Sequence, residues 1–184
     1  MLICLTAAVE YRQDSRKELE SCILELAKGK AEAMEPLYRI ANPPVYAFAL
    51  SLLKNAHDAE DAAQDCFVRA YFGAGSYRPQ GKPMAWLMTI TRNLCMEKLR
   101  ERKKRADVPE EDWDRYIESA AASPEDKIVL EQCMKALSDS ERQIVLLHAV
   151  GGMKHRETAA LMELPLATVL SKYSRALKKL KAKL

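Results

Sequence analysis

Charged side chains of one sign gather in three parts of this sequence, and each group could bind a partner of opposite charge. Four carboxylates stand between positions 58 and 65, with no Lys or Arg from 55 to 68. Residues 97–105 hold six bases against two acids, and residues 137–184 hold nine bases against four acids. Basic groups at this density suit the phosphates of a nucleic acid. The net charge of +3 is too small to name a partner by itself.

A metal site built from His57 and the nearby carboxylates is an interpretation that the spacing does not favour. Asp58 and Asp61 lie one helical turn apart, but Glu60 points elsewhere, and Asp58 near a helix start is a natural cap. No second histidine stands at ligand spacing. The chain also lacks a Gly-rich phosphate loop, a nucleophile elbow and a Ser/Cys–His arrangement. We therefore expect no enzyme activity, no metal and no cofactor.

The C-terminal segment has the pattern of a helix-turn-helix. A short helix is expected over 154–162, a tight turn at 163–164, and a last helix from Pro165 to the end. One face of the last helix is apolar, and the other carries hydroxyl and basic groups that could enter a major groove. These candidate DNA contacts are Thr168, Ser171, Lys172, Arg175 and Lys179. A plain helical hairpin with a solvated basic tail is the alternative.

A second candidate site lies in residues 73–83, where three Gly and two Pro predict a loop. Tyr77 stands in this loop near Arg78 and Lys82. An aromatic ring among basic groups suits the binding of an unstacked base. Trp86 begins the apolar stripe of the following helix, so we expect it in the core instead.

Helical spacing of apolar residues organises most of the chain that must position these groups. We expect helices over 17–28, 31–41, 44–53, 57–73 and 84–104. Asn42 is the expected cap of the third, because two prolines follow it. Residues 1–15 show no clear period and are predicted to form a loose arm. Further helix starts are expected at Ser123-Pro124 and at the capping box of Ser138 and Glu141.

An acidic segment separates the chain into two parts. Residues 107–126 hold eight acids and one base, so this segment should stay extended and mobile. The predicted fold is therefore all-α, with two small helical domains joined by a flexible acidic linker. We expect the first domain over 17–106, the linker over 107–123, and the helix-turn-helix domain over 124–184.

Cysteine usage and hydropathy bear on the compartment. Five cysteines are present, an odd number without a CxxC pair, which argues against a disulfide framework or a zinc knuckle. No segment approaches about 20 uninterrupted apolar residues, and no basic stretch precedes the apolar run 1–9. We expect reduced thiols packed as small apolar groups in a cytoplasmic protein.

Taken in order, these segments resemble extracytoplasmic-function (ECF) sigma factors of bacterial RNA polymerase. The stretch NAHDAEDAAQDCFVRAY (55–71) resembles their acidic helix, which docks on core polymerase. MAWLMTITRNLCMEKLRERKK (84–104) resembles the helix after their promoter-melting loop. Residues 136–180 resemble their second conserved domain, a helix-turn-helix. The resemblance covers about three quarters of the chain.

The resemblance implies a transcription-initiation factor with core RNA polymerase and promoter DNA as partners. The implied core-polymerase contacts are Asp58, Glu60, Asp61, Gln64 and Asp65. The implied minus-ten site comprises loop and helix residues, namely Ser76, Tyr77, Arg78, Lys82, Arg92, Asn93, Arg100 and Lys103. The candidate contacts of the last helix become readers of the minus-thirty-five element. Many relatives are held by an anti-sigma factor, although no residue here identifies one.

Several positions depart from the family pattern. Glu163 stands where a turn glycine is typical, and Leu170 replaces a usual base. Residues 1–18 have no counterpart, and the prolines at 36, 43 and 44 are unusual in the first helices. Two alternatives remain at this point: a helix-turn-helix regulator that acts without polymerase, and an adaptor that binds only proteins. The acidic helix and the aromatic-basic loop favour the sigma factor over the first, and the basic C-terminal half favours it over the second.

Overall fold

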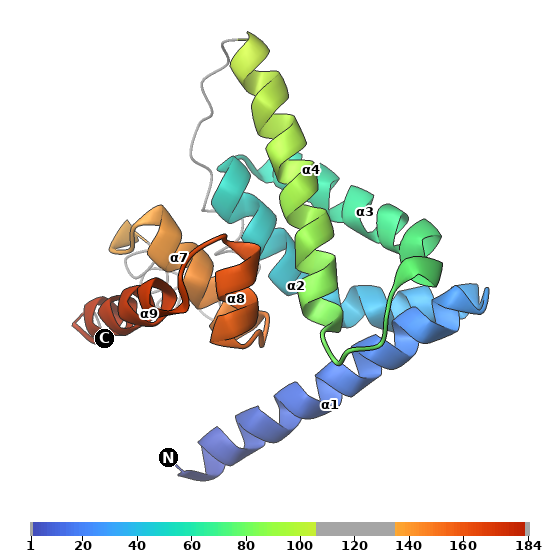
Figure 1. Cartoon of the computed structure of the whole chain (residues 1–184), viewed down its shortest axis with the longest axis horizontal. Coiled ribbons are helices and arrows are strands. Elements are labelled where there is room, and N and C mark those ends of the chain that lie inside the picture. The colour runs from blue at the N-terminus through green and yellow to red at the C-terminus, as the bar shows by residue number, and fades with distance from the viewer. Residues whose placement is uncertain (1, 106–134, 183–184) are drawn as a thin grey trace, which may run out of the picture.

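The computed structural model describes the backbone of residues 2–105 and 135–182, and the side chains of residues 15–103 and 135–182. All regular structure in these ranges is helical, which confirms the all-α fold (Figure 1). The expected linker over 107–123 and the helix start at Ser123-Pro124 lie outside the described residues. Within the described ranges, none of the helices has the length and apolar character that crossing a membrane requires.

The first helix is much longer than expected. Helix α1 spans Leu2–Ala27, so the prediction of a loose arm over 1–15 is wrong. Residues 2–27 contain neither Gly nor Pro, and extending an existing helix costs far less than nucleating one. The chain turns after α1 at Gly29, whose φ of 84° lies in the left-handed region that glycine tolerates.

The second helix runs through the prolines that were expected to start a new one. After a 3₁₀ turn, η1 (Ala31–Ala33), helix α2 spans Met34–Leu53 and contains Pro43 and Pro44. Each proline removes one intrahelical hydrogen bond. Pro44, Val45 and Phe48 are buried, however, so packing stabilises the helix across this point. The expected break at Asn42 is therefore wrong.

Helices α3 and α4 agree with the sequence pattern, with one change of cap. Helix α3 spans Ala56–Gly73, and the side chain of Asn55 caps it by accepting a 3.0 Å bond from the Asp58 amide. The cap is thus Asn55 rather than Asp58, whose carboxylate is left free to pair elsewhere. A 3₁₀ turn, η2 (Ala74–Ser76), and a loop lead to the long helix α4, Pro83–Arg105.

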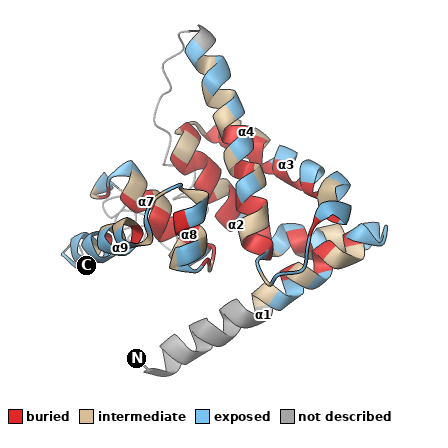
Figure 2. Ribbon diagram, in the orientation of Figure 1, coloured by how far each residue is buried: buried red, intermediate tan, exposed pale blue. Residues whose placement is uncertain are grey.

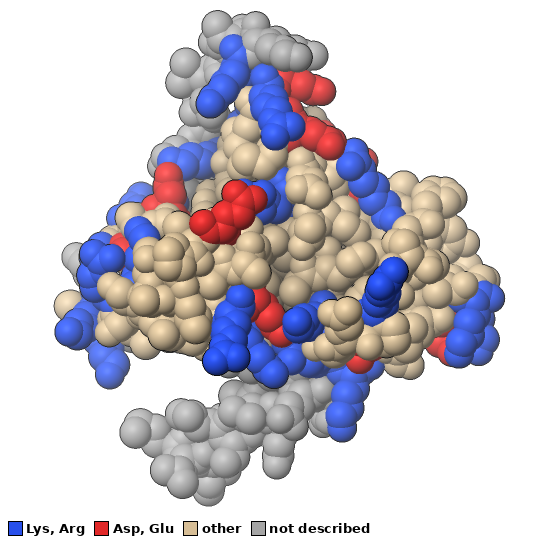
Figure 3. Space-filling view, viewed as in Figure 1, with Lys and Arg blue, Asp and Glu red and all other residues tan. Residues whose placement is uncertain are grey.

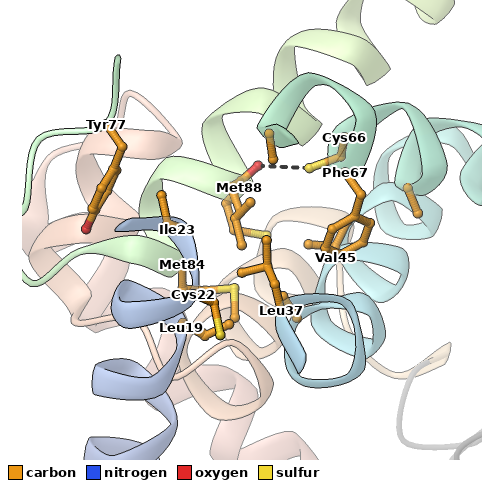
Figure 4. Packing of buried hydrophobic residues seen from close by; sticks show 14 of the residues in the cluster. Leu19, Cys22, Ile23, Leu37, Val45, Cys66, Phe67, Tyr77, Met84 and Met88 are labelled. Carbon is orange, nitrogen blue, oxygen red and sulfur yellow. Dashed lines mark hydrogen bonds between the residues drawn. The ribbon is translucent and has the colours of Figure 1, made fainter. Parts of the chain in front are cut away.

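Helices α1 to α4 form the front lobe, and their apolar faces meet in a common core. Figure 4 shows residues of α1, such as Leu19 and Ile23, close to Leu37, Phe67 and Met88 from the other helices. The described cysteines are free and buried in this lobe: Cys22, Cys66 and Cys95. Burial raises the pKa of the Cys66 thiol to about 11 and that of Cys95 to about 12. These three thiols therefore pack as small apolar groups, as predicted.

Helices α7 to α9 form the rear lobe. Helix α7 spans Asp139–Val145 and continues as a π-helical turn, η3 (Leu146–Val150). Its predicted capping box is confirmed, because Ser138 and Glu141 exchange side-chain and backbone hydrogen bonds. Helices α8 (His155–Leu161) and α9 (Leu166–Lys181) form the helix-turn-helix, with Glu163 in the turn at a φ of 56°.

The two lobes pack against each other through apolar side chains of η3 and the segment after it. Leu146 joins a buried cluster with residues of α2, while Leu147 and Met153 join the main front-lobe core. In Figures 1 and 2 the rear lobe lies beside α2 and α4, and the outer face of α9 is exposed. This arrangement places the loop and α4 of the front lobe next to α8.

Candidate protein and DNA interfaces

The predicted core-polymerase contacts of α3 differ in their surroundings. Asp58 forms ion pairs with Arg102 and, at 3.9 Å, with Lys98, while Asp61 lies 3.3 Å from the Lys98 ammonium. Both carboxylates are therefore partly neutralised by cations of α4. Gln64 and Asp65, one turn further along, are exposed. Among the described residues, no group of three His, Cys, Asp or Glu side chains could hold a metal ion.

The end of α3 carries an apolar surface that sequence reasoning missed. Phe72 is 81% exposed, and Val68, Tyr71 and Tyr38 of α2 are also exposed. Together with neighbouring residues they line an open groove of about 940 Å³. In the sequence, the run Phe67–Phe72 could have indicated this exposed apolar surface. Helical periodicity, however, places Tyr71 on the face of the helix that points toward the core. Gln64 and Asp65 lie one helical turn before Val68 on α3, so they adjoin this apolar surface.

Tyr77 of the loop does not lie open to solvent, in contrast to what a base-stacking role requires. Its ring is buried and meets the Trp86 ring in an edge-to-face arrangement, with the two centroids 5.3 Å apart. The Tyr77 hydroxyl donates a 2.8 Å hydrogen bond to Glu20 Oε1, which also accepts from the Gly81 amide. Burial and the Glu20 carboxylate raise the pKa of Tyr77. In this conformation Tyr77 fixes the loop to α1 and cannot stack on a base.

The remaining loop and α4 candidates lie on the surface. Ser76, Arg78, Lys82, Asn93, Arg100 and Lys103 are all exposed. Arg92 is half-buried, and its guanidinium lies 3.3 Å from a carboxylate oxygen of Glu163 in the rear lobe. A cleft of about 630 Å³ separates this part of α4 from α8. Figure 3 shows basic side chains gathered around the area where α8 faces α4.

The predicted readers on α9 differ in their exposure and in their hydrogen-bond or ion-pair partners. Ser171 and Arg175 are exposed, Thr168 is half-buried, and the Lys172 ammonium donates a 2.8 Å hydrogen bond to Ser140 Oγ. Lys179 lies 2.6 Å from Glu141 Oε2 of α7. Lys172 and Lys179 thus connect α9 to α7, and their assignment as DNA readers stays a prediction.

Glu141, the ion-pair partner of Lys179, is a buried carboxyl group with a lowered pKa. The Glu141 side chain is only 5% exposed. Burial alone would raise its pKa, but hydrogen bonds from Lys179 and Ser138 outweigh this effect and lower the pKa to about 2. Lys179 therefore stabilises a buried charge within the rear lobe.

Two histidines that the sequence did not relate to each other meet inside the helix-turn-helix. The rings of His148 and His155 stack with centroids 3.9 Å apart, and both contact Tyr173 of α9. His148 Nδ1 lies 2.7 Å from the Met153 carbonyl oxygen. Burial and the neighbouring His148 lower the pKa of His155. The stack connects η3, α8 and α9.

A helix-turn-helix lobe packed against a second helical lobe with acidic and basic faces defines a class of DNA-binding transcription proteins, and family models agree with both lobes. Residues 37–105 match the model "Sigma-70 region 2", and residues 127–180 match "Sigma-70, region 4". Together the two matches include all of α2 to α4 and α7 to α9 except the first three residues of α2 and the last residue of α9.

Curated relatives narrow the class. The chain is 31% identical to the ECF RNA polymerase sigma factor SigM of Bacillus subtilis over 153 residues, covering 81% of this chain and 93% of the relative. It is 32% identical to EcfG of Rhodopseudomonas palustris over 147 residues, covering 77% and 80%. The chain belongs to the ECF RNA polymerase sigma factors. This family directs RNA polymerase to promoters and is not a family of enzymes, so the metalloenzyme interpretation is excluded.

Solved structures show the same fold. CnrH, in complex with the cytosolic domain of CnrY, superposes with a TM-score of 0.61 at 22% identity, covering 90% of this chain and 96% of CnrH. The sigma factor RpoE of Bartonella quintana, in complex with the anti-sigma factor NepR, gives 0.58 at 24% identity, covering 79% and 92%. Both neighbours therefore support the two-lobed helical architecture.

Proposed function

We propose that this sigma factor divides promoter recognition between its lobes: the front lobe binds core polymerase and the minus-ten element, and the rear lobe reads the minus-thirty-five element. The observation that carries the proposal is the exposed face of α9, where Ser171 and Arg175 project from the second helix of a helix-turn-helix. Such a helix enters the major groove of duplex DNA, where hydroxyl and guanidinium groups contact bases and phosphates.

Core polymerase binds α3 in this proposal. Of the five predicted contacts, Gln64 and Asp65 are the most accessible, and they adjoin the exposed apolar groove that contains Phe72. A surface that combines an apolar centre with a polar edge is typical of protein interfaces. Asp58 and Asp61 are less available for contact with polymerase, because cations of α4 already pair with them.

The minus-ten element binds the loop and the adjoining face of α4. Exposed cations at Arg78, Lys82, Arg100 and Lys103 supply phosphate contacts, and Asn93 offers an amide for a base edge. Tyr77 contributes by fixing the loop to α1 through Glu20. An extruded base costs a few kcal/mol of unstacking, which these contacts must offset.

The test separates the two lobes with matched double variants. Ser171→Ala/Arg175→Ala should weaken promoter-dependent transcription, at a cost of roughly 1–3 kcal/mol for each base contact, while leaving core binding unchanged. Gln64→Ala/Asp65→Ala should weaken core binding in a pull-down and leave binding to minus-thirty-five duplex unchanged. Lys178→Ala is the control for loss of one exposed charge on α9. If both double variants fail at the same step, the proposed division is wrong.

Two further expectations accompany this function. Because polymerase and promoter DNA are its partners, we place the protein in the cytoplasm. CnrH was solved with the cytosolic domain of CnrY, and RpoE with the anti-sigma factor NepR; we propose that an anti-sigma factor binds this chain as well. Affinity purification from its native cells, in the resting and the stressed state, tests this point. The domain boundaries 17–106, 107–123 and 124–184 stay predictions that limited proteolysis can test.

A further inference from the structure

An ion pair connects the N-terminal helix to the helix-turn-helix. The guanidinium of Arg16 in α1 donates to both carboxylate oxygens of Glu157 in α8, at 3.1 and 2.9 Å. The Glu157 side chain is only 7% exposed, and it also accepts a 2.9 Å bond from the Lys154 amide. Arg16 lies in the segment 1–18 that the sequence resemblance leaves without a counterpart.

Two other ion pairs cross between the lobes, and each has a much more exposed carboxylate. Lys54 and Asp139 lie 3.1 Å apart, and the Asp139 side chain is 53% exposed. Arg92 and Glu163 lie 3.3 Å apart, and the Glu163 side chain is 74% exposed. Ion pairs so open to water contribute little. Removing Arg16, by contrast, leaves a carboxylate with almost no access to water while the lobes stay together. The Arg16–Glu157 pair is thus the polar contact that most favours this arrangement.

The arrangement itself is incompatible with the proposed promoter complex. Elements centred near minus ten and minus thirty-five are about 25 base pairs apart, which is roughly 85 Å of duplex at 3.4 Å per base pair. Here Arg92 of the proposed minus-ten face touches Glu163 in the turn of the helix-turn-helix. Residues of α8 also form one wall of the cleft over that face of α4. The lobes must separate before both elements can be bound.

We propose that α1 acts as an inhibitory clamp: the Arg16–Glu157 pair holds the helix-turn-helix over the minus-ten face of α4 until core polymerase separates the lobes. The inference rests on the proposed assignment of that face to the minus-ten element. The apolar contacts of Leu147 and Met153 and the ion pair jointly hold the lobes together with α8 over α4, so loss of the pair makes separation easier. Separation exposes both ions to water, so the clamp can open when polymerase binds.

The test uses charge reversal in the full chain without polymerase. Arg16→Glu and Glu157→Arg each place like charges together, and the double variant R16E/E157R restores the pair with opposite polarity. Lys17→Glu is the control, because it changes the net charge equally at the exposed neighbour of Arg16. Two quantities are measured: the radius of gyration by small-angle X-ray scattering, and the affinity for a forked promoter fragment whose minus-ten strand is single-stranded.

Each single variant should increase the radius of gyration and bind the forked fragment about tenfold more tightly than the wild type, a coupling of ordinary size. The double variant should return both quantities toward wild type, which a merely misfolded protein would not do, and Lys17→Glu should change neither. Single variants that stay compact, or that expand without a gain in affinity, overturn the clamp. Transcription by the wild type with core polymerase reports on the proposed function separately, so the two ideas can fail independently.

Discussion

Lys179 belongs to the predicted DNA contacts of α9, and it also forms an ion pair inside the rear lobe. Its ammonium lies 2.6 Å from the buried Glu141 carboxylate. We predict that Lys179→Ala lowers the stability of the rear lobe and affects DNA binding only through that loss. Lys178→Ala removes an exposed lysine from the same turn and is the matched control.

The expected loss of stability for Lys179→Ala follows from the pKa of the Glu141 carboxyl. Its pKa falls from an ordinary value of 4.5 to about 2, in spite of burial. At 1.36 kcal/mol per pKa unit, this lowering corresponds to roughly 3 kcal/mol in favour of the charged form. Lys179 provides the largest lowering contribution, and Ser138 remains in the variant. We therefore expect a loss of about 1–2 kcal/mol for Lys179→Ala, against a few tenths for Lys178→Ala.

Urea unfolding followed by circular dichroism, at several pH values, measures this loss. Because the pKa of Glu141 is lower in the folded protein than its ordinary value of 4.5, the ionised carboxylate stabilises the fold at pH values above 4.5. This contribution disappears as the pH falls through about 2. Without Lys179, burial raises the pKa of Glu141, so the variant should lose stability at a higher pH than the wild type. Equal stability of the two lysine variants, combined with a selective loss of promoter binding for Lys179→Ala, would refute the structural role.

Two more predictions concern the rear lobe and its contact with the front lobe. The pKa of His155 is lower in the folded lobe than its ordinary value of 6.5, so the neutral ring stabilises the lobe above pH 6.5. This contribution is lost as the pH falls below that value. The melting temperature should therefore drop between pH 7.5 and 5.5, and it should drop less in His155→Phe. Leu147 is fully buried between the lobes, so Leu147→Ala should cost about 2–5 kcal/mol in urea unfolding, whereas the exposed Val150→Ala should cost far less. Equal costs for these two would show that the lobes do not pack in solution.

Local sequence patterns were enough to predict helices α3 and α4 and the helix-turn-helix. The capping box of Ser138 and Glu141 acts over three residues, and the apolar stripe of α9 repeats within one helix, so both could be predicted without tertiary contacts. Glu163, which stands where a turn glycine is typical, adopts a φ of 56° in the turn. Charge grouping along the chain likewise identified the segments that bear the candidate interfaces.

Predictions failed where long-range packing outweighed a local signal. The prolines of α2 suggested a break, but burial of Pro44 and its neighbours keeps the helix continuous. Tyr77 looked like an open aromatic platform, but Glu20, 57 residues earlier, draws its hydroxyl into the protein. No window of sequence contains both partners of that bond, so periodicity could not reveal it.

Composition and spacing by themselves determined that this chain is helical, two-lobed and equipped to bind DNA, because those properties depend on residues within a few helical turns. Only the tertiary structure decided which charges remain available. Lys179 is paired with Glu141, Asp58 with Arg102, and Arg16 with Glu157, each across a large distance in sequence. Coulomb attraction depends on distance in space, and the folded chain alone sets that distance.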